Sequence, residues 1–91
     1  MDETRLKRLR FRAWRRGFRE ADLILGPFAD SRGQSLTEDQ VLVFEQLLDL
    51  ADHDVYGWIV SEAAPPAFAT DVISLIRAFH ASGPHPRGVH T

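Results

Sequence analysis

Hydrophobic positions recur every three or four residues along most of the chain, and no stretch alternates with a period of two. This spacing is typical of amphipathic α-helices rather than half-buried β-strands. The pattern predicts an all-α fold, a small five-helix bundle in a single domain over residues 1–82. Residues 83–91 have no apolar face, and we expect them to form a disordered tail rich in Pro, Gly and His.

The first helix is predicted over residues 4–16, with Thr4 as its N-cap. At 100° per residue, five arginines fall within an arc of roughly 100°, and apolar side chains occupy most of the remaining surface. The basic arc consists of Arg5, Arg8, Arg12, Arg15 and Arg16, and the apolar face of Leu6, Leu9, Phe11, Ala13 and Trp14.

Gly17 interrupts this pattern. It either ends the first helix as a left-handed residue or acts as a hinge from which a second helix starts at a new angle. The second helix follows from Phe18, with Ala21, Ile24 and Phe28 on one face. Pro27 lacks an N–H group and clashes with the preceding turn, so we expect it to bend this helix. Residues 30–35 predict a loop.

The third helix has the clearest start signal. Thr37 and Gln40 have the spacing of a capping box, and Leu36 can pack on Val41 as a hydrophobic staple. The helix is predicted to continue to about residue 50. Its buried face is expected to contain Val41, Phe44, Leu48 and Ala51.

Two shorter helices complete the bundle. The fourth is predicted from Val55 to Ser61, capped by an aspartate of the preceding segment 52–54 and weakened by Gly57. The fifth follows Pro65-Pro66, with Pro66 at its first helical position. Its buried face is expected to contain Phe68, Val72, Leu75, Ile76 and Phe79.

Composition agrees with a globular protein of one domain. The 91 residues are 44% hydrophobic and 26% charged, as in ordinary folded proteins. The absence of cysteine excludes a disulfide framework, a zinc–thiolate site and a thiol nucleophile. No apolar run approaches the roughly 20 residues that a membrane-spanning helix needs, and we expect neither membrane insertion nor a signal peptide.

Charge is distributed unevenly along the chain. Residues 1–20 carry eight basic side chains against three acidic ones, whereas residues 21–91 carry three basic against ten acidic. Such a split indicates either an interaction surface at one end of the chain or neutralisation between its segments.

Catalytic motifs are missing from the sequence. It contains no glycine-rich phosphate loop, no nucleophile elbow and no HExxH spacing. His53 lies between Asp52 and Asp54, but adjacent residues rarely converge on one metal ion, and helix capping by an aspartate is the favoured interpretation. We therefore expect a protein that is not an enzyme and has no metal or cofactor of its own.

The segment Arg16-Gly17-x-x-Glu20 carries the functional signal. Composition alone would make it a joint between helices, with Arg16 and Glu20 as an exposed ion pair at i, i+4. It follows an arginine-rich helix, however, and precedes Asp22 and the pair Pro27-Phe28. In this context it resembles the RGxxE motif of the succinate dehydrogenase assembly factor family, which comprises small bacterial and mitochondrial proteins needed for covalent attachment of FAD.

A second block supports the resemblance. Leu47-Leu48 followed by Asp52-x-Asp54-x-Tyr56-x-Trp58 is similar to a Leu-Leu…Asp-x-Asp-hydrophobic-aromatic-x-Trp segment of that family. The likeness covers about residues 4–80. Phe18 stands where methionine is most frequent, and Ala21 where a large residue is frequent, which affects packing contacts rather than chemistry.

The resemblance implies a small all-α fold and a partner, the flavoprotein subunit of succinate dehydrogenase and often that of fumarate reductase. FAD is then joined to a histidine of the partner, and this chain promotes the attachment without a cofactor of its own. The family's functional surface corresponds here to Arg16, Gly17 and Glu20. Further residues expected on the partner-binding surface are Arg15, Arg19, Asp22, Asp52, Asp54 and Tyr56.

The two aromatic residues of the second block also have a structural interpretation. Trp58 is favoured as a core residue, since tryptophan in a small protein is usually buried. Tyr56 is balanced between core and interface, where tyrosine is enriched.

Two other functions remain open at this point. The arginine-rich first helix could bind nucleic acid, although the acidic remainder of the chain and a basic face without interleaved aromatics argue against it. A membrane-surface helix or targeting presequence is disfavoured by Asp2 and Glu3. We therefore expect a bacterial cytoplasmic protein that is monomeric when free and binds no nucleic acid.

Overall fold

The computed structural model describes residues 2–15, 17–61 and 63–83. Within these ranges the chain forms α-helices and two 3₁₀ turns and no strand, which confirms the all-α prediction. The helices are α1 (Glu3–Trp14), α2 (Arg19–Arg32), α3 (Glu38–Leu47), α4 (Asp52–Val60) and α5 (Thr70–Ala81), and the 3₁₀ turns are η1 (Gly33–Ser35) and η2 (Ala67–Ala69). The predicted tail lies almost entirely outside the described residues.

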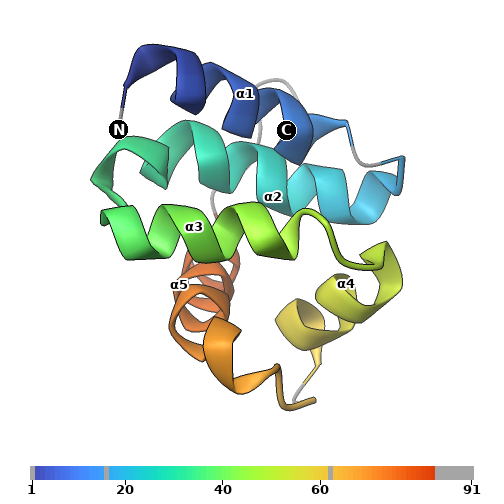
Figure 1. Ribbon diagram of the computed structural model, residues 1–91. Coiled ribbons are helices and arrows are strands. Elements are labelled where there is room, and N and C mark those ends of the chain that lie inside the picture. The colour runs from blue at the N-terminus through green and yellow to red at the C-terminus, as the bar shows by residue number, and fades with distance from the viewer. Residues whose placement is uncertain (1, 16, 62, 84–91) are drawn as a thin grey trace.

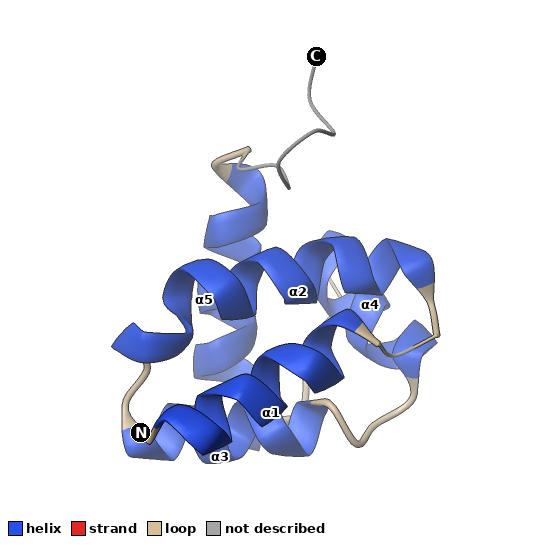
Figure 2. Cartoon of the chain, turned by 90° about the horizontal axis from the view of Figure 1, so that it is seen from above, coloured by secondary structure: helices blue, strands red, loops and turns tan. Residues whose placement is uncertain are grey.

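Helix α2 lies at the centre of the bundle. Figure 1 shows α1, α2 and α3 running along similar directions, and α4 and α5 packed on the other half of the molecule. In Figure 2, α1 lies beside α2, and α5 passes behind α2 at a steep angle. Helix α2 also contacts α4, so it touches elements from both halves of the chain.

Three phenylalanines from three helices form the middle of the core. The ring of Phe28 on α2 meets Phe44 on α3 edge-on at a centroid distance of 5.5 Å, and Phe79 on α5 at 5.6 Å. Edge-to-face pairs of this kind add about 0.5–1.5 kcal/mol to the hydrophobic burial. They bind α2, α3 and α5 to one another.

Helix α2 includes Pro27, where a bend was predicted, and the predicted loop at residues 30–35 is wrong, because these residues are helical. The helix continues through Pro27 to Arg32, and η1 follows directly. A proline inside a helix costs one hydrogen bond and a steric adjustment. Burial of Phe28 and Ala29 in the core favours the helical path beyond it.

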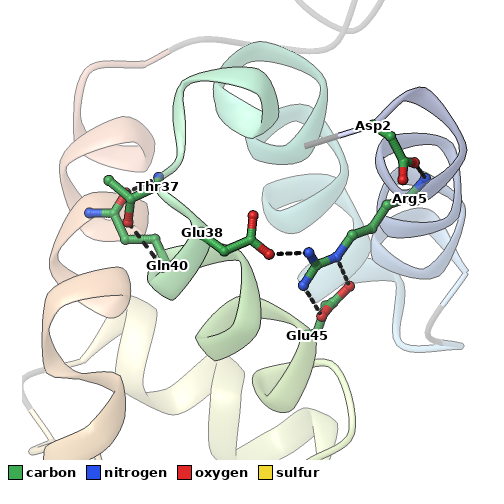
Figure 3. Close-up of polar contacts among 6 residues, drawn as sticks. All are labelled: Asp2, Arg5, Thr37, Glu38, Gln40 and Glu45. Atoms are coloured by element: carbon green, nitrogen blue, oxygen red, sulfur yellow. Dashed lines mark hydrogen bonds and ion pairs between the residues drawn. The ribbon is translucent and has the colours of Figure 1, made fainter.

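The start of α3 confirms the capping box. The Thr37 side chain accepts from the backbone N–H of Gln40 (3.1 Å), and the Gln40 side chain accepts from the N–H of Thr37 (2.9 Å; Figure 3). Gln40 also donates through Nε2 to Asp71 at the start of α5 (3.0 Å). One residue therefore caps α3 and links it to α5.

Other helix starts differ from the predictions. Asp2, not Thr4, caps α1, because its carboxylate reaches the N–H of Arg5 (2.7 Å). No aspartate caps α4: Ala51 is at the N-cap, and Asp52 is already helical. Helix α5 starts at Thr70, because residues 67–69 take the tighter 3₁₀ form after the proline pair.

Several apolar residues lie on a different side of their helix than predicted. Phe68 and Leu75 are 47% and 37% exposed, and Ile73 is buried on α5 in their place. Helix α3 ends at Leu47, which is buried, rather than at about residue 50, and Ala51 is exposed at the N-cap of α4. Phe11, predicted on the apolar face of α1, is 59% exposed. The arrangement of neighbouring helices selects which apolar residues are covered, and periodicity alone does not carry that information.

Basic residues of α1 pair with acidic residues elsewhere in the chain. Arg5 donates through Nε and Nη2 to the two carboxylate oxygens of Glu45 (3.1 and 3.0 Å) and through Nη1 to Glu38 (Figure 3). Arg12 pairs with Asp49 after α3, and Arg10 lies 3.7 Å from Asp30 on α2. The uneven charge along the sequence is therefore neutralised in part between segments.

Helix α1 approaches α2 closely at Gly26. A β-carbon on Gly26 would lie 2.3–2.8 Å from atoms of the Trp14 indole ring. The indole Nε1 donates to Asp30 on α2 (3.1 Å), which holds the ring in this position.

No helix in the described part of the chain combines the length and the apolar character that crossing a bilayer requires.

Replacing Gly26 with alanine should destabilise the protein by about 1–3 kcal/mol, the range for an overpacked core, because the new methyl group displaces the Trp14 ring. Urea denaturation measures the effect. Gly57→Ala is the matched control, since it adds the same group to α4 where, apart from the neighbouring residues and backbone of that helix, no described atom lies within 4 Å. That variant should gain about 0.5–1 kcal/mol from helix propensity. Equal stability of the two variants would contradict the close contact.

The pairing of Arg5 with Glu45 predicts a pH dependence. Hydrogen bonding by Arg5 lowers the pKa of Glu45 below its ordinary value of 4.5, and the same bond raises the pKa of Arg5. A lowered folded-state pKa stabilises the protein above the unfolded value, and this stability is lost as pH falls through the folded one. Wild-type protein should therefore be more stable than Glu45→Gln at pH 7, and urea denaturation should show the difference shrinking below pH 4.5. A difference independent of pH would contradict the ion pair.

Candidate functional site

Gly17 lies in the turn between α1 and α2 and is left-handed, with φ of +91°. This conformation agrees with the prediction of a left-handed residue at the end of the first helix rather than a hinge. Helix α1 nevertheless ends earlier, at Trp14, and α2 starts at Arg19. Apart from its two chain neighbours, no described residue has an atom within 4 Å of the point where a β-carbon would be. The turn therefore needs glycine for its backbone conformation, and it leaves an open surface around that position.

The motif residues beside Gly17 have different placements. Arg16 lies outside the described residues. Glu20 is exposed in the first turn of α2, and no ion pair among the described residues includes it. Asp22 is half-buried in the same turn and interacts within the chain. Two carboxylates near a helix N-terminus interact favourably with its dipole.

Phe18 connects this turn to α4. Its ring lies 4.7 Å from the ring of His53 and meets Tyr56 edge-on at 5.3 Å. Phe18 and Tyr56 are both half-buried and pack against the core. The structure therefore brings the two blocks of the sequence together, through an aromatic contact that sequence reasoning treated as packing only.

The acidic residues of the second block lie at the start of α4. Asp52 is half-buried and interacts within the chain, whereas Asp54 is exposed. Trp58 packs against the core but stays half-buried, so the favoured core assignment is only partly correct. Arg77 on α5 donates to the carbonyl oxygen of Trp58 (2.6 Å) and to that of Ala63 (2.8 Å). These bonds hold the end of α4 against α5.

A groove of about 400 Å³ lies between the end of α1 and the link from α3 to α4. Figure 1 shows this link and the α1–α2 turn at the same end of the molecule. The groove is lined by Phe11, Arg12, Arg15, Leu48, Leu50, Ala51 and Asp52. The sequence indicated Arg15 and Asp52 but not Phe11 and Leu50, because apolar residues of predicted helices carry no signal of exposure. Leu48 is buried, as predicted.

Exposed charges of both signs occur at this end of the molecule. Arg15 is exposed at the end of α1, and its guanidinium lies 4.8 Å from the centroid of the Phe11 ring. Arg19 is exposed at the first position of α2. Glu20 and Asp54 present the opposite charge. The surface thus has a mixture of charge and aromatic edges, which is typical of protein recognition.

A metal site does not form around His53. Among residues 2–15, 17–61 and 63–83, no group of three or more His, Asp or Glu side chains lies close enough to hold an ion. The geometry instead provides an exposed, left-handed glycine at residue 17, followed by Phe18, which packs on His53 and Tyr56 of α4.

Known proteins resemble this chain over most of its length. Residues 7–80 match the model of a family described as the flavinator of succinate dehydrogenase. A Legionella pneumophila protein named FAD assembly factor SdhE is 34% identical over 77 residues, which cover 85% of this chain and 96% of that protein. The protein of the same name from Pseudomonas aeruginosa is 38% identical over 64 residues, which cover 70% and 75%.

A mitochondrial relative is longer. The succinate dehydrogenase assembly factor 2 of Dictyostelium discoideum is 38% identical over 72 residues, which cover 78% of this chain but only 51% of that protein. The chain thus spans about half the length of this relative. The names of these relatives describe assembly factors and not enzymes. With the family model matched across α1 to α5, the chain belongs to the family of succinate dehydrogenase flavinators.

Proposed function

We propose that this protein binds the flavoprotein subunit of succinate dehydrogenase and promotes covalent attachment of FAD to it, with the flavoprotein of fumarate reductase as a second partner. The observation that carries the proposal is the open, left-handed turn at Gly17, held beside α4 by Phe18, in a chain of the flavinator family. We infer further that the free protein is a monomer of the bacterial cytoplasm; relatives that match it along most of its length occur in bacteria.

The division of labour follows from the chemistry. Attachment joins the 8α-methyl carbon of FAD to a histidine of the partner, and the flavin and the partner's groups supply the reacting atoms. This chain contributes by holding the partner so that the histidine and the methyl carbon approach each other. Positioning of reacting groups contributes several kcal/mol to a rate without acid, base or nucleophile from the helper.

Gly17 has a specific part in this docking. The space around its α-carbon is open, so the partner's backbone can approach closely where a side chain would hold it away. Arg16 and Glu20 then make charge-assisted hydrogen bonds to the partner on either side. Arg15, Arg19 and Asp54 supply exposed charge around this centre. Asp22, Asp52 and Tyr56 are half-buried and shape the surface as well as contacting the partner.

Substitution of the motif tests the proposal. Arg16→Ala and Glu20→Ala should each lower covalent flavin fluorescence of the denatured flavoprotein about tenfold or more in a strain without the native gene, because a hydrogen bond to a charged group contributes about 1.5–3 kcal/mol. Circular dichroism should show an intact fold for both variants. Arg8→Ala is the control, since it removes one charge from α1 outside the motif. Full flavinylation by the two motif variants, or an equal loss with Arg8→Ala, would contradict the assignment.

Two changes at Gly17 separate backbone strain from steric exclusion. Both Gly17→Ala and Gly17→Arg place a β-carbon on a left-handed residue and should lose about 1–2 kcal/mol of stability. Only the arginine side chain is long enough to hold the partner away. Flavinylation per folded molecule, measured together with thermal denaturation, should therefore fall much further for Gly17→Arg. The same value for both variants would show that close approach at Gly17 is not required.

Nucleic-acid binding is less well supported by the structure than by the sequence. Arg5, Arg10 and Arg12 each pair with a carboxylate of the same chain, which lowers the charge available for phosphate contacts. We expect only weak binding of duplex DNA at physiological salt, falling steeply as salt rises. A gel shift with sequence preference at submicromolar protein would reverse the order of the two functions.

A further inference from the structure

Phe11 is exposed on the outer face of α1 without a structural reason. It has the largest exposed fraction, 59%, among the exposed large hydrophobic residues of the described chain. A phenylalanine left in water forgoes much of the roughly 1.5–3 kcal/mol that burial of its ring would provide. The position therefore adds little to the stability of the free protein, and its surroundings indicate what covers it.

Phe11 stands between two hollows. On one side is the groove that also contains Asp52 and Leu50, and on the other is a second hollow of about 390 Å³. The residues that line this second hollow lie along the outer face of α1 and its C-terminal end, and we call them the Phe11 ridge. It consists of Lys7, Arg10, Phe11, Trp14 and Arg15.

The ridge is basic, and part of it is held in place. Lys7, Arg10 and Arg15 line the same hollow as Phe11, and the Arg15 guanidinium lies 4.8 Å from the centroid of the Phe11 ring. Trp14, on the same hollow, is held by its contact with Gly26 and its hydrogen bond to Asp30. Side chains already held in place lose little conformational entropy on binding. Aromatic and arginine side chains in such a setting are the residues that most often dominate the binding energy of interfaces.

We propose that Phe11 is an apolar anchor that inserts into a recess of the flavoprotein lined at its edge by carboxylates, beside the contact made by the Gly17 turn. The inference rests on the proposed function and adds a second, separate contact to it. Arg15 belongs to the ridge and lies two residues from Gly17, so one partner surface can cover both. Lys7 and Arg15 favour an acidic rim around the recess, whereas the charge of Arg10 is already opposed by Asp30 at 3.7 Å.

Charge at the edges of the ridge favours a protein over a nucleic acid or an anionic lipid surface. Asp30 lies 3.7 Å from Arg10, and Asp52 lines the neighbouring groove. A continuous array of phosphates would be repelled by these carboxylates, whereas a folded partner can place its own charges to suit both signs. One exposed phenylalanine also suits a single recess better than a series of stacked bases.

Binding of the purified flavoprotein subunit by the full chain tests the anchor. Phe11→Ala should weaken the affinity measured by calorimetry about tenfold or more, while the melting temperature stays within about 2 °C, because the ring is mostly exposed. Phe68→Ala is the matched control, since Phe68 is 47% exposed on η2 and lies outside the ridge. Phe11→Leu keeps an apolar group and should lose less affinity than Phe11→Ala. Wild-type affinity for folded Phe11→Ala overturns the proposal.

The charge requirement has its own pair of variants. Lys7→Glu reverses a charge on the ridge. Arg8→Glu reverses the next charge of the same helix, but Arg8 does not belong to the ridge, and its charge interacts with Glu45 of α3. Lys7→Glu should weaken binding more than Arg8→Glu at low salt, and the difference should diminish at high salt. Equal effects of the two variants overturn the acidic rim.

Failure of the anchor and failure of the proposed function give different results. If Gly17→Arg loses binding and Phe11→Ala does not, the anchor is wrong and the motif assignment stands. If the wild-type protein does not bind the flavoprotein at all, the proposed function is wrong. If Phe11 acts only in docking, excess Phe11→Ala protein should restore the full rate of flavinylation, because a higher concentration compensates for weaker binding. A rate that stays low at saturating protein overturns a role in docking alone.

Discussion

Burial of one face of α2 is the constraint on which the rest of the structure depends. Phe28 joins α3 and α5 through two edge-on ring contacts, and Gly26 admits the Trp14 indole of α1. The residues from Ile24 to Ala29 are all buried, although this stretch includes a glycine and a proline that would weaken an isolated helix. Tertiary packing therefore outweighs local propensity at the centre of the bundle.

The position of the candidate site follows from this packing. Because α1 and α2 are held together along their length, the turn that joins them is short and exposed at one end of the bundle. Phe18 then seats the turn on α4 through His53 and Tyr56. Arg77 holds the far end of α4 against α5. Packed helices thus present the site residues on the surface, which suits the proposed action by positioning of a partner.

Charge has two separate roles on α1. Arg5 and Arg12 turn toward the carboxylates near α3 and tie the N-terminal helix to the bundle. Lys7 and Arg15 lie on the outer face with Phe11, where they remain available to a partner. The net charge of −2 conceals both roles, because eight of the eleven basic residues lie within residues 1–20 and ten of the thirteen acidic ones lie within residues 21–91.

Local patterns in the sequence determined the helical class, the capping box of Thr37 and Gln40, and the motif that indicates the family. These features depend on residues within a few positions of one another. The exposure of Phe11 and the contact of Phe18 with Tyr56 were decided only by the tertiary structure, as was the pairing of Arg5 with Glu45, 40 residues away. Each depends on how helices distant in sequence pack together, and the 3.6-residue period of one helix does not encode its neighbours.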